Sequence, residues 1–234
     1  MNILITGASR GIGAASYGLL KKSGHKVVGH STSGSDELIA GDLSDPLSPR
    51  NIWDTAMDEL EGRIDVLVNN AGIYEAVADN ASDEDWHAAW HRTLTINLQA
   101  AADLSRLAVS HFLDRGGEGR IVNVSSRAAF RGDSPQHWHY AASKAAMVGM
   151  TRTIARGYAA DGILCFAVAP GFTVSEMTDE YLQGRGGAQI IADIPLGRVA
   201  STAEIAEVIR WLAIDAPGSA TGTIIDANGA SYVR

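Results

Sequence analysis

Tyr140 and Lys144 are the residues of this chain whose types and spacing best suit proton transfer. They are four positions apart in a stretch, 140–154, that is rich in alanine and free of proline, which predicts a helix. Residues four apart lie on one face of a helix, so the phenol and the ammonium group would be neighbours. A nearby cation lowers the pKa of a phenol, and such a phenol can exchange a proton with a carbonyl or alcohol oxygen. A surface helix carrying the two residues by chance has the same spacing.

A glycine-rich segment near the start of the chain is suited to binding phosphate. Gly7, Gly11 and Gly13 connect an apolar strand predicted at 2–6 with a helix predicted at 12–23. Glycine lets the backbone approach a ligand closely, and the first N–H groups of the helix attract an anion. The same glycines also suit a simple tight turn, but their position after an N-terminal strand favours a nucleotide site.

The elements that would position these residues alternate between apolar and amphipathic stretches. Strands are predicted at 2–6, 26–30, 64–68, 120–124, 163–169 and 222–226, and helices at 12–23, 52–60, 83–113, 140–154 and 204–214. The helix at 83–113 is too long for one straight element, so we expect a break near Thr93. Trp53, Ala56, Met57 and Leu60 share the core-facing side of their helix.

Four further motifs follow the glycine loop, and they are Asn69-Asn70-Ala71-Gly72, Asn97, Val124-Ser125-Ser126 and Pro170-Gly171. In this order, and together with the tyrosine and lysine, they resemble the short-chain dehydrogenase/reductase family over almost the whole chain. The resemblance implies one Rossmann-type, doubly wound α/β domain at 1–234. Its seven-stranded parallel sheet should have the order 3-2-1-4-5-6-7 and be flanked by helices. The glycines within 172–196 also predict a mobile lid over the substrate.

The activity implied by the resemblance is hydride transfer between NADP(H) and a ketone/secondary alcohol pair (EC 1.1.1.-), as in 3-oxoacyl-carrier-protein reductases. Tyr140 would be the general acid, and Lys144 would lower its pKa and hold the nicotinamide ribose. Ser126 would bond the substrate oxygen, with Ser125 as the alternative, and Asn97 would shape a water path unless it is a plain core amide. Two other functions remain open, which are an NAD-dependent alcohol dehydrogenase of the same family and a non-catalytic nucleotide-binding regulatory protein.

The resemblance also implies which residues bind the cofactor. They are Gly7, Ser9, Arg10, Gly11, Ile12, Gly13, Ser31, Thr32, Asp42, Leu43, Asn70, Ala71, Gly72, Tyr140, Lys144, Pro170, Gly171, Thr173 and Ser175. Asp42 matches the position that bonds the adenine amino group, although it could equally cap the helix that follows Pro46.

The end of the second strand favours NADP(H) over NAD(H). A carboxylate at this position would bond the ribose 2′-hydroxyl and repel a 2′-phosphate, and none occurs before Asp36. Arg10 and the hydroxyls of Ser31, Thr32 and Ser33 can instead bond the phosphate. Arg10 could also be an ordinary solvated loop residue.

The segment between Ser126 and Tyr140 is predicted to line the substrate cleft. It contains Arg127, Phe130, Arg131, His137, Trp138 and His139. The two histidines have no acidic or cysteine partner nearby in the sequence, so a metal site is not expected.

Composition narrows the remaining classes of function. The formal net charge of −8, without a basic stripe, argues against a nucleic-acid partner. No apolar run approaches the length of a membrane span, and the chain begins without a signal-like segment. A single cysteine fits the reducing cytoplasm. We therefore expect a cytoplasmic enzyme with a small-molecule substrate, assembled as a dimer or homotetramer.

Overall fold

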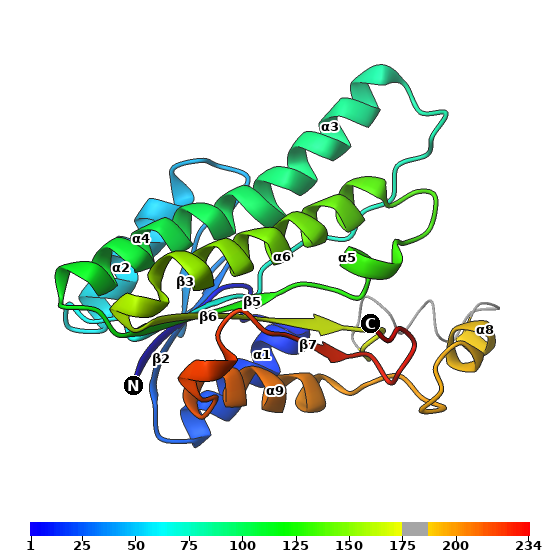
Figure 1. Cartoon of the computed structure of the whole chain (residues 1–234). Coiled ribbons are helices and arrows are strands. Elements are labelled where there is room, and N and C mark those ends of the chain that lie inside the picture. Colours follow the sequence, from blue (N-terminus) through cyan, green and yellow to red (C-terminus); the bar gives the residue numbers. More distant parts are fainter. Residues whose placement is uncertain (175–186) are drawn as a thin grey trace.

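A seven-stranded, all-parallel sheet forms the centre of the molecule (Figure 1). The computed structural model describes residues 1–174 and 187–234. The strands are β1 (Asn2–Ile5), β2 (Lys26–Ser31), β3 (Leu38–Ala40), β4 (Val66–Asn69), β5 (Gly119–Val124), β6 (Ile163–Pro170) and β7 (Ile224–Ala227). Their order is β3-β2-β1-β4-β5-β6-β7, so the predicted fold class and strand order are confirmed.

Helices cover both faces of this sheet, as Figure 1 shows. One face carries α1 (Gly11–Lys22) and α9 (Thr202–Ile214), which pack against each other, and the other carries α2 (Ser48–Glu59), α4 (Ala100–Asp114) and α6 (Trp138–Tyr158). The shorter or outlying helices are α3 (Asp83–Leu94), α5 (Ala128–Arg131) and α8 (Gly187–Ala192). The first half of α3 extends beyond the body of the molecule (Figure 1).

Alternating side chains of the central strands build two cores, one on each face. Leu4 of β1 and Leu67 of β4 face the layer that contains α2 and α4. Their neighbours Ile3, Ile5 and Val66 face the layer that contains α1 and α9. Successive strand residues point to opposite faces, so burial on both sides requires the nearly continuous apolar runs seen in the sequence.

The long stretch predicted as a broken helix is three helical segments. The α3 helix leads into a π-helix at Thr95–Gln99, and α4 follows at once. The break therefore begins just after Thr93, in the π-helix that contains the buried Asn97. Single π-turns of this kind occur frequently at functional sites. The α2 prediction is also confirmed, since Trp53, Ala56 and Leu60 are buried.

Two loops follow the carboxyl ends of β2 and β6. No helix separates β2 from β3; the chain turns through Ser35 and Leu38, which pair with each other. The predicted lid at 172–196 falls largely on 175–186, which lie outside the described residues.

None of the described helices is both long and apolar enough to cross a membrane.

Candidate active site

A cavity of about 810 Å³ opens at the carboxyl ends of the strands, where ligands bind in sheets of this type. Its walls come from the glycine loop, the turns after β4, β5 and β6, the start of α6, and α8. They include Ile12, Asn70, Gly72, Ser125, Ser126, Tyr140, Lys144, Pro170, Gly171 and Thr173. Residues that are far apart in the sequence and were predicted to act together therefore face one space.

Tyr140 and Lys144 lie side by side on the first turns of α6, as their spacing predicts. The ammonium nitrogen of Lys144 is 5.8 Å from the centre of the Tyr140 ring, and it donates a hydrogen bond to the Val124 carbonyl at 2.8 Å. The lysine is almost completely buried. The pair is thus fixed by the end of β5 as well as by its own helix.

The pKa values of this pair follow burial rather than mutual attraction. Burial raises the pKa of Tyr140 to about 12, although the nearby Ser126 hydroxyl opposes the rise. Burial also lowers the pKa of Lys144 to about 8. The sequence-based expectation that Lys144 lowers the pKa of the phenol is therefore wrong for this structure. Lys144 points its charge at a backbone carbonyl, while removal from water disfavours the charged form of both groups.

Ser125 and Ser126 have different surroundings, although both line the cavity. Ser125 is buried and donates its hydroxyl to the Lys144 carbonyl at 2.9 Å, which ties β5 to α6. Ser126 is less buried, accepts a bond from the Ala128 N–H at 3.1 Å, and lies close enough to Tyr140 to affect its pKa. This contrast supports Ser126 as the residue that meets a substrate oxygen.

Asn97 is fully buried in the π-helix, and its side chain bonds Ile73, which lines the cavity, and Ser143 of α6. Its amide accepts from the Ile73 N–H at 2.8 Å, donates to the Ile73 carbonyl at 3.0 Å, and donates to the Ser143 hydroxyl at 3.3 Å. A Cβ on Gly72 would lie 3.2 Å from the Asn97 oxygen and 3.3 Å from the Lys144 nitrogen. Asn97 and Lys144 therefore approach the same glycine from two helices.

The glycine loop has the close backbone contacts that a dinucleotide site needs. A Cβ on Gly13 would lie 1.9 Å from the Gly7 carbonyl oxygen, so only glycine fits there. Gly7 itself has φ +67°, a left-handed conformation. Asn70 fixes the loop from β4, because its amide donates to the carbonyls of Thr6 at 2.9 Å and Gly7 at 3.1 Å. The residues present therefore fit a bound dinucleotide, whose phosphates would lie at the start of α1.

A smaller hollow of about 400 Å³ extends this site past the end of β2. It is lined by Ala8, Ser9, Tyr17, Ser31, Ser33, Gly34, Ser35, Glu37 and Leu38. Beneath it, the buried His30 donates to the Gly41 carbonyl at 2.8 Å and accepts from the Gly7 N–H at 3.4 Å. Burial lowers the pKa of His30, which keeps its ring neutral. The hollow offers hydroxyl groups where the predicted NADP(H) contacts require them.

The remaining residues predicted to bind the cofactor differ in their exposure and in their hydrogen bonds. Arg10 and Thr32 are exposed, and Arg10 precedes α1 without a side-chain cap bond. Asp42 bonds the backbone and hydroxyl of Ser44, which lowers its pKa, so the alternative that it caps α2 is wrong. Leu43 is buried, whereas Gly11 and Ala71 are partly exposed at the cavity side of the sheet. Ser175 lies outside the described residues.

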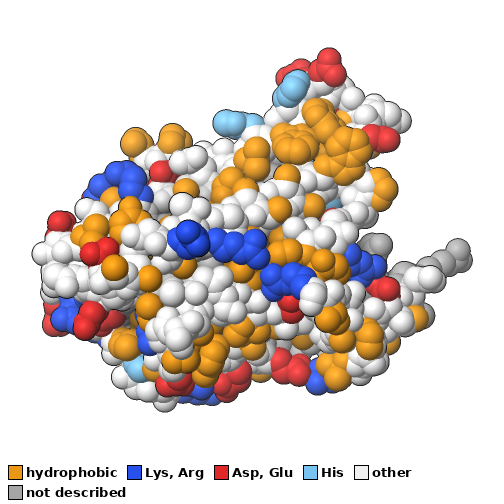
Figure 2. Space-filling view, in the orientation of Figure 1, with side chains coloured by type: hydrophobic (Ala, Val, Ile, Leu, Met, Phe, Trp, Pro, Cys, Tyr) orange, Lys and Arg blue, Asp and Glu red, His pale blue; other side chains and the backbone are white. Residues whose placement is uncertain are grey.

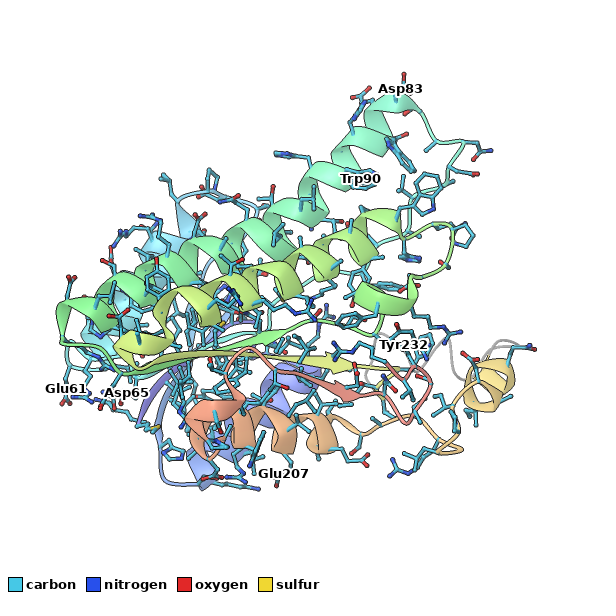
Figure 3. All side chains as sticks on the ribbon, in the orientation of Figure 1. Glu61, Asp65, Asp83, Trp90, Glu207 and Tyr232 are labelled. Atoms are coloured by element: carbon cyan, nitrogen blue, oxygen red, sulfur yellow. The ribbon has the colours of Figure 1, made fainter. Side chains whose placement is uncertain are left out.

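The segment after Ser126 contributes only part of its predicted lining. Arg127 and Arg131 face the cavity, together with Gly132, Asp133 and Ser134. Trp138 is 53% exposed and stacks edge-on against Trp86, and His139 is fully buried beside Trp90. Their prediction as cleft residues is therefore wrong, because the start of α6 turns them toward α3. Figure 3 shows Trp90 on the projecting part of α3.

Two cavity residues escaped the sequence analysis. The ring of Tyr74 stacks on His137 at 3.9 Å and meets the ring of Tyr140 edge-on at 4.8 Å. Glu37 reaches the smaller hollow because no helix separates β2 from β3, and it pairs with Lys21 at 3.3 Å. Neither residue belongs to a motif, so no local pattern in the sequence identified them.

Comparisons with known proteins agree with this geometry. A family model described as enoyl-(acyl carrier protein) reductase matches residues 7–229. The chain is 35% identical to the 3-oxoacyl-[acyl-carrier-protein] reductase of Escherichia coli, covering 98% of this chain and 96% of the relative. It is 36% identical to the enzyme of that name from Thermotoga maritima, over 97% and 95% of the two chains. It is also 35% identical to the acetoacetyl-CoA reductase of Rhizobium meliloti, over 98% and 97%.

Proposed function

Because the chain belongs to the short-chain dehydrogenase/reductase family, we propose that it is an oxidoreductase that uses NADP(H) to interconvert a ketone and a secondary alcohol. The names of its relatives point to 3-oxoacyl compounds as the class of substrate. The observation that carries the proposal is the convergence of Ser126, Tyr140 and Lys144 on a cavity that also reaches the glycine loop.

In the reaction that we propose, the nicotinamide cofactor supplies or accepts the hydride when it is bound. Ser126 and Tyr140 bond the carbonyl oxygen of the substrate, and Tyr140 gives that oxygen its proton during reduction. A phenol whose pKa is raised to about 12 carries this proton at neutral pH, as a general acid must. Lys144 binds the nicotinamide ribose, and Asn97 holds the backbone of Ile73 at the cavity wall.

The test of this function is NADPH oxidation with a panel of ketones that includes 3-oxoacyl thioesters, 3-oxo esters and simple ketones. We expect turnover with at least one 3-oxoacyl compound, and formation of the corresponding alcohol measured by mass spectrometry. A folded protein that binds NADPH but reduces no member of the panel would contradict the proposal.

Cofactor preference is a separate prediction. We expect NADPH to be preferred over NADH by about ten- to hundredfold in kcat/KM, the effect of one charge-assisted contact to the 2′-phosphate. Arg10→Ala should remove most of this preference and leave NADH use little changed. Ser31→Asp should reverse it, since a carboxylate at the end of β2 repels the phosphate. Steady-state kinetics with both cofactors gives the answer, and equal use of the two by the wild-type protein would refute it.

Lys21→Gln tests the effect of Glu37, the carboxylate that the sequence analysis missed, on cofactor preference. Lys21 holds Glu37 at 3.3 Å at the edge of the smaller hollow. Without this partner the Glu37 charge should oppose the phosphate, and the preference for NADPH should fall. A double variant that also carries Glu37→Gln should restore it.

Assembly through α4 and α6 is the next prediction. The small or apolar side chains of these helices differ in exposure: Met147 and Ala101 are buried within the chain, Ala141 is partly exposed and Ala145 is exposed on α6. Hydrophobic side chains also gather on the projecting part of α3 (Figure 2). We expect a dimer or tetramer with two-fold symmetry in sedimentation at micromolar concentration, weakened by Ala145→Arg. A wild-type monomer under these conditions would contradict this.

We also propose that the enzyme works in the cytoplasm, a reducing compartment that suits the buried free thiol of Cys165.

A further inference from the structure

Arg127 occupies a position that the proposed reaction does not use. It follows Ser126 directly, and its backbone N–H donates to the Pro170 carbonyl at 2.9 Å, which fixes it between the ends of β5 and β6. Its guanidinium lies 4.7 Å from the centre of the Phe172 ring, and both residues line the large cavity. A planar cation therefore shares the cavity with the proposed catalytic serine.

One buried nitrogen of the half-buried guanidinium lacks the partner that a buried donor requires. Its Nη1 is buried and has no hydrogen-bond partner in the part of the chain that the structure describes, where Arg127 also forms no ion pair. Burial, reinforced by the charge of Arg131, lowers the pKa of Arg127. A buried, unpaired donor on a charged group costs stability, so this arrangement favours an anion that arrives with a ligand.

The acidic residues closest to Arg127 are already engaged. Asp193 pairs with Arg131 at 2.5 Å, and Asp133 accepts bonds from the Tyr74 hydroxyl at 3.0 Å and from the Ser134 N–H at 2.7 Å. The other basic residues of the cavity wall are also satisfied, since Arg131 has Asp193 and Lys144 donates to a backbone carbonyl. Among the described cavity residues, Arg127 is thus the cation left for a ligand.

We propose that Arg127 binds a carboxylate of the substrate, so that the preferred substrate is an oxo acid with a free carboxylate close to the reacting carbonyl. This inference rests on the proposed ketone reduction. A guanidinium presents two parallel N–H groups that match the two oxygens of a carboxylate. A thioester group offers only a neutral oxygen and would leave the half-buried guanidinium without an anionic partner. Because Arg127 and Ser126 line the same cavity, the carboxylate is placed close to the ketone in this proposal, as in a 3-oxo acid.

The test measures binding, so that it does not depend on turnover. Acetoacetate and its neutral analogue acetoacetamide are titrated by calorimetry into the protein saturated with NADP⁺. We expect the wild-type protein to bind acetoacetate about ten- to hundredfold more tightly than acetoacetamide, and Arg127→Gln to remove this difference. Arg127→Lys, which keeps the charge without the paired N–H groups, should restore part of it.

Arg131→Gln is the matched control, because Arg131 lies in the same cavity but has Asp193 as its partner. It should change the preference for acetoacetate by about fivefold at most. Equal affinity of the wild-type protein for the two probes, no measurable binding of acetoacetate, or an unchanged preference in Arg127→Gln would each overturn the inference. So would an equal loss of NADP⁺ affinity in Arg127→Gln, since Arg127 would then serve a cofactor phosphate.

Reduction of ethyl acetoacetate by NADPH separates this inference from the proposed function. This neutral ketone should be reduced by both the wild-type protein and Arg127→Gln. If the wild-type protein reduces ethyl acetoacetate but does not bind acetoacetate more tightly than acetoacetamide, the proposed function stands and the inference about Arg127 fails. If the wild-type protein reduces no ketone, the proposed function itself fails.

Discussion

Tyr140→Phe is expected to lower kcat by about 10²–10⁴-fold, the usual contribution of a positioned proton donor. At about 1.4 kcal/mol per decade, this is roughly 3–5 kcal/mol of transition-state stabilisation. The substitution removes only the hydroxyl. The ring keeps its edge contact with Tyr74 at 4.8 Å and its position 5.8 Å from the Lys144 ammonium. NADPH affinity and thermal stability should therefore change little, and the loss should be confined to the chemical step.

Tyr74→Phe is the matched control for this experiment. Tyr74 presents a second phenol on the same cavity wall, but its hydroxyl donates to Asp133 at 3.0 Å. Single-turnover reduction, followed by NADPH absorbance, should slow far less in Tyr74→Phe than in Tyr140→Phe. Comparable rates in the two variants would mean that Tyr140 does not supply the proton.

Local patterns in the sequence predicted six of the strands and the pairing of Tyr140 with Lys144, whereas the strand order and most other residues of the proposed site were implied by the family resemblance. The continuous apolar runs of β1 and β4 require helices on both faces, and this requirement leaves few arrangements for a parallel sheet. The spacing of Tyr140 and Lys144 placed both on one side of α6. The break in the long helix was also predictable from its length, although its form as a π-helix around Asn97 was not.

What the sequence did not predict depends on burial and on contacts between distant segments. The direction of the Tyr140 pKa shift was wrong, since i,i+4 spacing shows which groups are neighbours but not how much water the fold removes. Glu37 entered the smaller hollow only because the chain turns directly from β2 into β3. Arg127 was expected in the cleft, but only the structure shows that Asp133 and Asp193 have other partners.

Gly13→Ala is expected to damage both the fold and the proposed cofactor site. The new methyl group would lie 1.9 Å from the Gly7 carbonyl oxygen and 2.5 Å from the Asn70 amide nitrogen. Neither group can retreat easily, because Asn70 holds the Gly7 carbonyl through a 3.1 Å hydrogen bond. Overpacking of this kind costs about 1–3 kcal/mol of unfolding free energy. The displaced loop should also bind NADPH at least about tenfold more weakly, a loss of about 1.4 kcal/mol.

Gly18→Ala provides the control within the same helix, α1. A Cβ on Gly18 meets no atom within 4 Å, so alanine should stabilise the helix by about 0.5–1 kcal/mol through its better helix propensity. Urea unfolding should therefore show a higher stability for Gly18→Ala with an unchanged NADPH affinity, whereas both stability and affinity should fall for Gly13→Ala. Normal NADPH affinity in a folded Gly13→Ala protein would show that cofactor binding does not depend on the close packing of Gly13 against Gly7.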